Sequence, residues 1–207
     1  MSITKTLTLV CVATALATPL QAADFSDPTW PCIQRKVENL SLGLMWPAPV
    51  DATLIGDDEI LRQDVYDLAD ALALRRVDLD EMRPLVEAFG AKYGGDQDKL
   101  GLVFERVFSG LSKRRGRIIT GIGDFSLSQI ALAEQIDSAR TEMDTQLALA
   151  EPDFDKVDAL EEQLDWDQLI HSDRQRSITY LCETPLIIER RLFAIAQLLQ
   201  QMVQEQG

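Results

Sequence analysis

The chain contains a single histidine, His171, with Asp167 four residues before it. A catalytic histidine needs a positioned nucleophile and an orienting acid, and no serine or cysteine motif accompanies this pair. Zinc, copper and nickel sites usually take several histidine or cysteine ligands. We therefore predict that His171 lies in a polar layer or on the surface. We also predict no catalytic residues, no metal site and no cofactor.

Two other patterns only partly match known ligand-binding motifs. Gly116, Gly121 and Gly123 have the spacing of a phosphate loop but lack the Gly-Lys-Ser/Thr ending and a preceding strand. Acidic groups around residues 78–80 and 153–158 lack the central glycine and terminal glutamate of a calcium loop. These acids fit better as helix caps and first-turn acids.

A run of four cations within five residues stands out in a chain whose formal net charge is −14. Its members are Lys113, Arg114, Arg115 and Arg117. Such a cluster is a candidate contact for an anion, for a carboxylate-rich or phosphorylated partner, or for lipid headgroups. It could equally neutralise the protein's own acidic helix, and we favour this internal role. The acids in question are Asp64, Asp67 and Asp70.

The first 22 residues have the pattern of a secretory signal. Lys5 precedes an uncharged apolar run, Pro19 breaks it, and Ala22 offers a small residue at the cleavage position. The run is too short to span a bilayer as a stable helix. We predict a mature chain that begins near Ala23 and resides in the periplasm.

Signal cleavage would remove Cys11 and leave two cysteines, Cys32 and Cys182. Two cysteines in an exported protein most simply form one disulfide, so we predict a Cys32–Cys182 bridge. The alternative is two separate thiols. Neither cysteine belongs to a Cys-x-x-Cys motif, which argues against a thiol oxidoreductase.

The composition is that of a globular and strongly acidic protein. The chain has 34 acidic and 20 basic residues, and 46% of its residues are hydrophobic. Negative charge repels nucleic acid and anionic lipid, so both are poor partners. Beyond the signal no stretch is apolar over 18 residues, and we expect no membrane-spanning segment.

Hydrophobic periodicity predicts an all-α fold, since apolar residues recur at three- and four-residue spacing and alternation is missing. We expect an extended arm with prolines and tryptophans at residues 23–56 and an all-helical domain at 57–207. Within that domain, residues 57–112 fit a bundle of short helices. Residues 113–207 fit a long antiparallel helical hairpin with a coiled-coil seam.

Two features make the hairpin irregular. Glycines weaken the start of its first helix, which we expect near Ser126, and Pro185 should kink or split the second. Seam positions of the second helix become polar at Asp167, His171 and Arg174, while the apolar residues shift to neighbouring positions. We take this as a rotation of the apolar stripe towards a new partner. The shifted residues are Trp166, Leu169 and Ile170.

The second helix also outruns the first. We expect the excess beyond Pro185 to fold back onto the bundle rather than to dock on another protein.

Long seamed helices without catalytic motifs favour a non-enzymatic interaction, adaptor or assembly factor for an envelope complex, with a protein partner. The alternative is a periplasmic module that binds a small ligand or cation in a cavity between bundle and hairpin. An exported enzyme comes third, and the oligomeric state stays open.

Overall fold

The computed structural model describes residues 27–206, and among these it contains helices but no strand. In chain order the helices are α1 (Leu42–Met45), the 3-10 helix η1 (Ala52–Ile55), α2 (Glu59–Leu72), α3 (Leu79–Tyr93), α4 (Gln97–Leu147) and α5 (Phe154–Gln206). The predicted all-α class is confirmed. The predicted signal at residues 1–22 lies outside the described residues.

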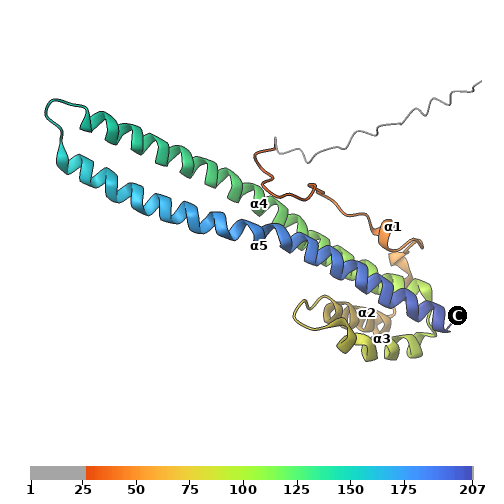
Figure 1. Ribbon diagram of the computed structural model, residues 1–207. Helices are drawn as coiled ribbons and strands as arrows, with labels where there is room; N and C mark the ends of the chain where they lie inside the picture. Colours follow the sequence, from red (N-terminus) through yellow and green to blue (C-terminus); the bar gives the residue numbers. More distant parts are fainter. Residues whose placement is uncertain (1–26, 207) are drawn as a thin grey trace, which may run out of the picture.

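Helices α4 and α5 form one antiparallel hairpin that runs the length of the molecule (Figure 1). They contain 51 and 53 residues, which corresponds to roughly 75–80 Å each at 1.5 Å per residue. Residues 148–153 connect them at the far end. Helices α2 and α3 lie on one side of the pair near its open end, and the arm with α1 lies on the other (Figure 1).

Helix α4 is continuous, so our expectation of a separate helix starting near Ser126 is wrong. It also crosses the expected boundary between residues 112 and 113 without a break. A glycine weakens a helix by only about 1 kcal/mol, and tertiary packing on both sides outweighs that cost. At Gly123 the missing side chain has a use, because a Cβ there would lie 3.4 Å from the Cβ of Thr29 in the arm.

Helix α5 likewise continues through Pro185, which is buried within it, so the expected split does not occur. One backbone hydrogen bond is lost at a proline, and packing of the helix on both sides compensates. Because α4 begins at Gln97, the two helices are equal in length within two residues. The expected fold-back is therefore wrong: the end of α5 reaches the bundle as a straight continuation of the hairpin.

The main core lies at this open end, which we call the head: α2, α3 and the halves of α4 and α5 that pack on them. Its core comprises 21 buried residues, and Ile188, Leu192 and Ile195 of α5 are fully buried there. From the arm, Trp46 stacks on Phe104 of α4 with ring centroids 5.5 Å apart. The predicted helical bundle thus exists, but it shares its longest helices with the hairpin.

The predicted acidic caps are present at Asp78 and Asp153, and the structure adds a third at Asp58. The Asp58 side chain accepts from the backbone N–H of Leu61, and Asp78 accepts from that of Asp80. Asp153 accepts from the N–H of Lys156 at the start of α5. Each cap satisfies a backbone donor that the first turn of a helix leaves free.

Among residues 27–206, no helix combines the length and the hydropathy that a bilayer crossing requires.

Candidate interaction surface

The arm is held to the middle of the hairpin by the predicted disulfide. Cys32 and Cys182 are bonded, with their Cα atoms 5.5 Å apart, and both are buried. Trp30 packs beside them against Ile119 and Ile122 of α4. The arm is therefore part of the folded unit at this point, and the bridge marks the boundary between the head and the rest of the hairpin.

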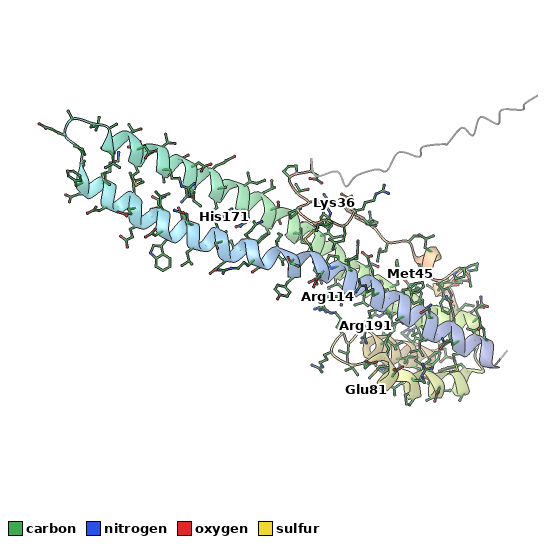
Figure 2. The ribbon with its side chains drawn as sticks, in the orientation of Figure 1. Lys36, Met45, Glu81, Arg114, His171 and Arg191 are labelled. Atoms are coloured by element: carbon green, nitrogen blue, oxygen red, sulfur yellow. A yellow bond between two sulfur atoms is a disulfide. The ribbon has the colours of Figure 1, made fainter. Side chains whose placement is uncertain are left out.

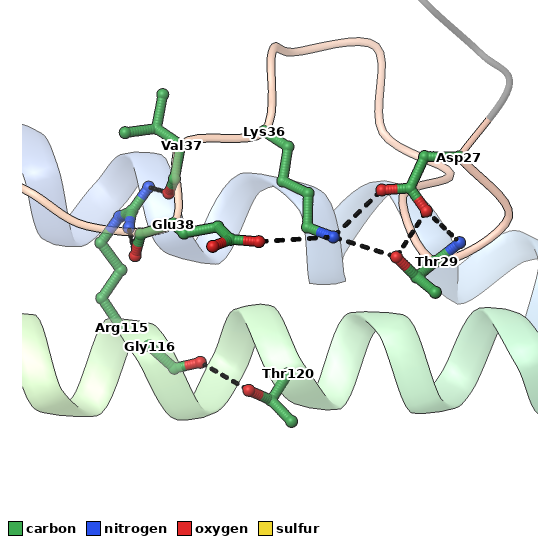
Figure 3. Close-up of polar contacts among 8 residues, drawn as sticks. All are labelled: Asp27, Thr29, Lys36, Val37, Glu38, Arg115, Gly116 and Thr120. Atoms are coloured by element: carbon green, nitrogen blue, oxygen red, sulfur yellow. Dashed lines mark hydrogen bonds and ion pairs between the residues drawn. The ribbon is translucent and has the colours of Figure 1, made fainter.

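Arg115 is the one member of the cationic cluster that turns inward (Figure 3). Its side chain is 4% exposed, and its Nε donates to Glu189 Oε1 at 2.7 Å. Its two terminal nitrogens donate to the backbone carbonyls of Val37 and Glu38, at 2.6 and 3.2 Å. Arg115 thus connects α4, α5 and the arm.

The counter-charge of Arg115 differs from the one we expected. Its carboxylate partner is Glu189 and not the acidic face of α2, where Asp64 instead accepts from Lys92 and from the hydroxyl of Tyr93. The other three cations of the cluster, Lys113, Arg114 and Arg117, are exposed. Helical spacing was the signal that distinguishes Arg115, because it lies four residues after the buried Leu111 and four before the buried Ile119 on α4.

A second polar network holds the start of the arm (Figure 3). The Thr29 side chain and backbone N–H both donate to the Asp27 carboxylate, and Lys36 Nζ lies 3.0 Å from it. These donors lower the pKa of Asp27 to about 2, with the Thr29 hydroxyl as the largest cause and the Thr29 N–H as the next. The network fixes the arm where it meets the close approach at Gly123.

Beyond the disulfide the hairpin continues as a two-helix projection, residues 128–173, which we call the distal hairpin. Its own core cluster consists of three buried residues, Ile136, Ala139 and Leu164. Leu132, Met143 and Leu160 pack against this cluster, and the seam is polar near the predicted positions Asp167 and His171. Gln135 donates to Asp167 at 2.7 Å, and Gln129 donates to the backbone carbonyl of His171 at 3.2 Å.

His171 is half-buried on α5 in this polar layer (Figure 2). Within the described part of the chain, no group of three or more histidine, cysteine or acidic side chains is arranged to hold a metal ion.

The outer face of α5 carries a row of exposed apolar side chains. Trp166 is 61% exposed, Leu169 52%, Ile170 38% and Tyr180 75%. At 3.6 residues per turn they lie opposite the buried Leu164 and Cys182. The apolar shift that we interpreted as a rotation of the stripe towards a new partner meets no partner among the described residues, because the seam stays on α4 and these residues face outward. We call Trp166, Leu169, Ile170 and Tyr180 the outer row.

The row has an acidic border. A shallow groove on α5 is lined by Trp166, Leu169 and four acidic side chains. The four are Asp158, Glu161, Glu162 and Asp165. None of them makes an ion pair or side-chain hydrogen bond with any other residue in 27–206. The distal hairpin contains thirteen acidic and two basic residues, a net charge of −11 out of −14 for the whole chain.

Sequence reasoning noted the apolar shift at residues 166–170 but interpreted it as a rotation of the whole stripe, whereas the seam persists and the shifted residues lie on the opposite face of α5. One signal in the sequence could have corrected this interpretation: apolar residues continue at seam positions of α5 both before and after the shift. Val157, Leu164, Ile178 and Cys182 keep one face of α5 buried or half-buried before and after the shift. Because the seam face of α5 packs on α4, the opposite face stays exposed wherever no third helix covers it.

The chain was compared with protein-family models, with curated proteins and with solved structures, and none of the three comparisons found a match. The fold and surface define a class only in structural terms: an all-α protein with a compact head and a projecting acidic helical hairpin.

Proposed function

We propose that this is a non-enzymatic exported interaction protein, an adaptor or assembly factor for an envelope complex, and that its distal hairpin is the partner-binding part. The observation that carries the proposal is the outer row. Single exposed apolar residues are common on protein surfaces, but large ones gathered on one helix face with a polar border are typical of interaction sites. Three of the four lie within five consecutive residues, 166–170.

The position of the row fits the same role. Trp166 is separated from Ile188 in the head core by 22 residues of continuous helix, roughly 33 Å at 1.5 Å per residue. The head can therefore hold the hairpin while the row remains free to meet another molecule. For the ligand-binding alternative, Leu72, Val86, Ile188 and Leu192 form part of one buried core where the short helices meet α5, and an open groove lined by Arg62, Tyr66 and Arg106 lies between α2 and α4.

An exported location is part of the proposal. The Cys32–Cys182 bridge supports it, because disulfides persist mainly in oxidising compartments such as the periplasm. The signal pattern at residues 1–22 supports it independently.

Site-specific photo-crosslinking in intact cells tests the function. A photoreactive amino acid at position 169 should yield a covalent adduct with one defined envelope protein, identified by mass spectrometry. The matched control carries the same group at Glu87, an exposed position on α3 in the head. Adducts from position 87 but not from 169, or from neither, would contradict the proposal. A thermal shift with a small molecule but no protein adduct would favour the ligand-binding alternative.

A further inference from the structure

We infer that the outer row of α5 and its acidic border form a docking site for a basic amphipathic α-helix of a partner protein. This inference rests on the proposed function and names the chemistry of the partner. Three properties of the surface carry it: its shape, its charge, and the free state of the acids around it.

The shape of the surface favours a helix as the occupant. The row follows one continuous helix: Trp166, Leu169 and Ile170 lie three and four residues apart, and Tyr180 lies two heptads after Trp166, with Asp173, ion-paired to Arg176, at the heptad position between them. This spacing of three, four and seven residues is the repeat that a second helix needs in order to pack along the first. A helix laid there would convert the two-helix distal hairpin into a three-helix bundle and cover a face that the chain itself leaves open.

The charge of the surface favours a basic occupant. Asp158, Glu161, Glu162 and Asp165 lie along one flank of the row and line the groove beside Trp166. Because no ion pair engages them within the described residues, they remain available for lysine or arginine side chains of a partner. A helix with apolar anchors and a basic flank would match both the row and its border.

The same charges argue against a second copy of this chain. Pairing two outer faces of α5 would bring two acidic borders together, each on a distal hairpin of net charge −11. Like charges at a close interface cost free energy and suppress that pairing. Nucleic acid and anionic membrane surfaces are disfavoured for the same reason.

Trp166 supplies its own reporter. The chain has three tryptophans, of which Trp30 is 7% exposed, Trp46 2% and Trp166 61%. Burial of an exposed indole shifts its fluorescence emission to shorter wavelength and protects it from acrylamide quenching. A change in tryptophan emission therefore reports on this face and not on the head.

The probe is a synthetic 21-residue helical peptide with leucine at the a and d heptad positions and lysine on the flanks. We expect saturable binding to the intact disulfide-bonded protein, with a blue shift of the Trp166 emission. Two control peptides define the chemistry: one has glutamate in place of lysine, and one has the same composition in scrambled order. Both should bind at least tenfold more weakly.

Protein variants locate the site. Leu169→Ser with Ile170→Ser should weaken binding of the lysine peptide at least tenfold, since buried apolar anchors dominate helix docking. Glu161→Gln, Glu162→Gln and Asp165→Asn together should weaken it about fivefold and reduce its salt dependence. A charge-matched control removes three exposed acids elsewhere on the distal hairpin, by Glu134→Gln, Asp144→Asn and Glu151→Gln, and should leave binding within twofold.

Several results would overturn the inference. They are no binding of the lysine peptide, equal binding of the scrambled peptide, equal loss in the charge-matched control, or concentration-dependent dimerisation that Leu169→Ser abolishes. The proposed function can survive that failure. A protein adduct from position 169 in cells, together with failure of the lysine peptide, would keep the interaction role and exclude the basic-helix chemistry.

Discussion

The head and the distal hairpin are built from the same two helices but bury very different amounts of apolar surface. The head encloses 21 buried core residues, whereas the distal hairpin has a core cluster of three. Isolated helices are marginal in water, and most helical stability in proteins comes from packing of an apolar face. The difference indicates that the head is the folding unit and that the distal hairpin is a low-stability extension of it.

The distribution of charge also predicts that the distal hairpin is less stable than the head. The distal hairpin carries −11 of the net −14, so the rest of the molecule is nearly balanced. Self-repulsion in an acidic two-helix projection opposes tight packing, and local opening costs least where few apolar contacts must be broken. Binding of a partner to the outer row would therefore add apolar burial where the chain itself has little, and would stabilise the distal hairpin more than the head.

The largest expected effect on stability comes from shortening one buried leucine side chain in each of the two cores. Leu192→Ala in the head should lower the free energy of unfolding by about 4 kcal/mol, because Leu192 is fully buried and the cavity cannot collapse. Leu164→Ala in the distal hairpin should cost about 2 kcal/mol or less, since its surroundings can close around the gap. Urea unfolding of both variants measures the difference. Equal losses would show that the hairpin is one cooperative unit and would remove the distinction drawn here.

The disulfide at the boundary between the two regions should have the next largest effect. Replacing both cysteines, by Cys32→Ser and Cys182→Ser, should reduce stability by about 3 kcal/mol, because the bridge closes a long loop in the unfolded chain. Thermal unfolding of the variant, compared with the wild type before and after reduction, checks it. If reduced wild type and variant both unfold like the oxidised protein, the arm contributes nothing to the head.

Removal of the carboxylate beside Arg115 should have an intermediate effect. Glu189→Gln removes the counter-charge of the buried guanidinium and leaves a neutral amide oxygen beside the two arm carbonyls, and we expect a loss of about 2 kcal/mol. Glu189 is 28% exposed, so solvent screening keeps the loss below that of a fully buried pair. The control is Glu183→Gln, an exposed position on the same helix, which should be neutral in chemical denaturation.

The smallest effect is a pH dependence in the head. Hydrogen bonds from Lys92 and then Tyr93 lower the pKa of Asp64 below its unfolded value of about 3.9. The folded carboxylate thus contributes stability above about pH 4, and this contribution is lost as the pH falls through the lower folded pKa. Asp64→Asn should cost under about 1 kcal/mol at pH 7, a difference that shrinks towards pH 3. A constant difference from pH 7 to pH 3 would contradict the assignment.

A matched change in the distal hairpin sharpens this comparison. The pKa of Glu142 is lowered by Lys156 and then Gln146, across the loop between α4 and α5. Glu142→Gln should leave global unfolding unchanged but accelerate amide hydrogen exchange near residues 142–156, because that end opens locally. Protection spread evenly along α4 and α5 would argue against a stability difference between head and distal hairpin.

The sequence by itself determined the features that depend on the local residue pattern or on the even number of cysteines left after signal cleavage. Apolar spacing of three and four residues predicts helices, Asp78 and Asp153 predict two of their starts, and two cysteines outside the signal predict one bridge. The polar layer near Asp167 and His171 also follows from the pattern, because a seam position that becomes polar needs a polar partner across the hairpin, as Asp167 finds in Gln135.

Only the tertiary structure decided which of several locally acceptable outcomes occurs. Three glycines and one proline cost a few kcal/mol at most, so packing on both sides carries α4 through Gly123 and α5 through Pro185. Arg115 lies on the buried face of α4 between Leu111 and Ile119, and Glu189 and the disulfide-bonded arm supply the acceptors for its buried guanidinium. The exposure of Trp166 was decided in the same way: the short helices cover α5 only in the head (Figure 1), and beyond them the face opposite the α4 seam is open to solvent.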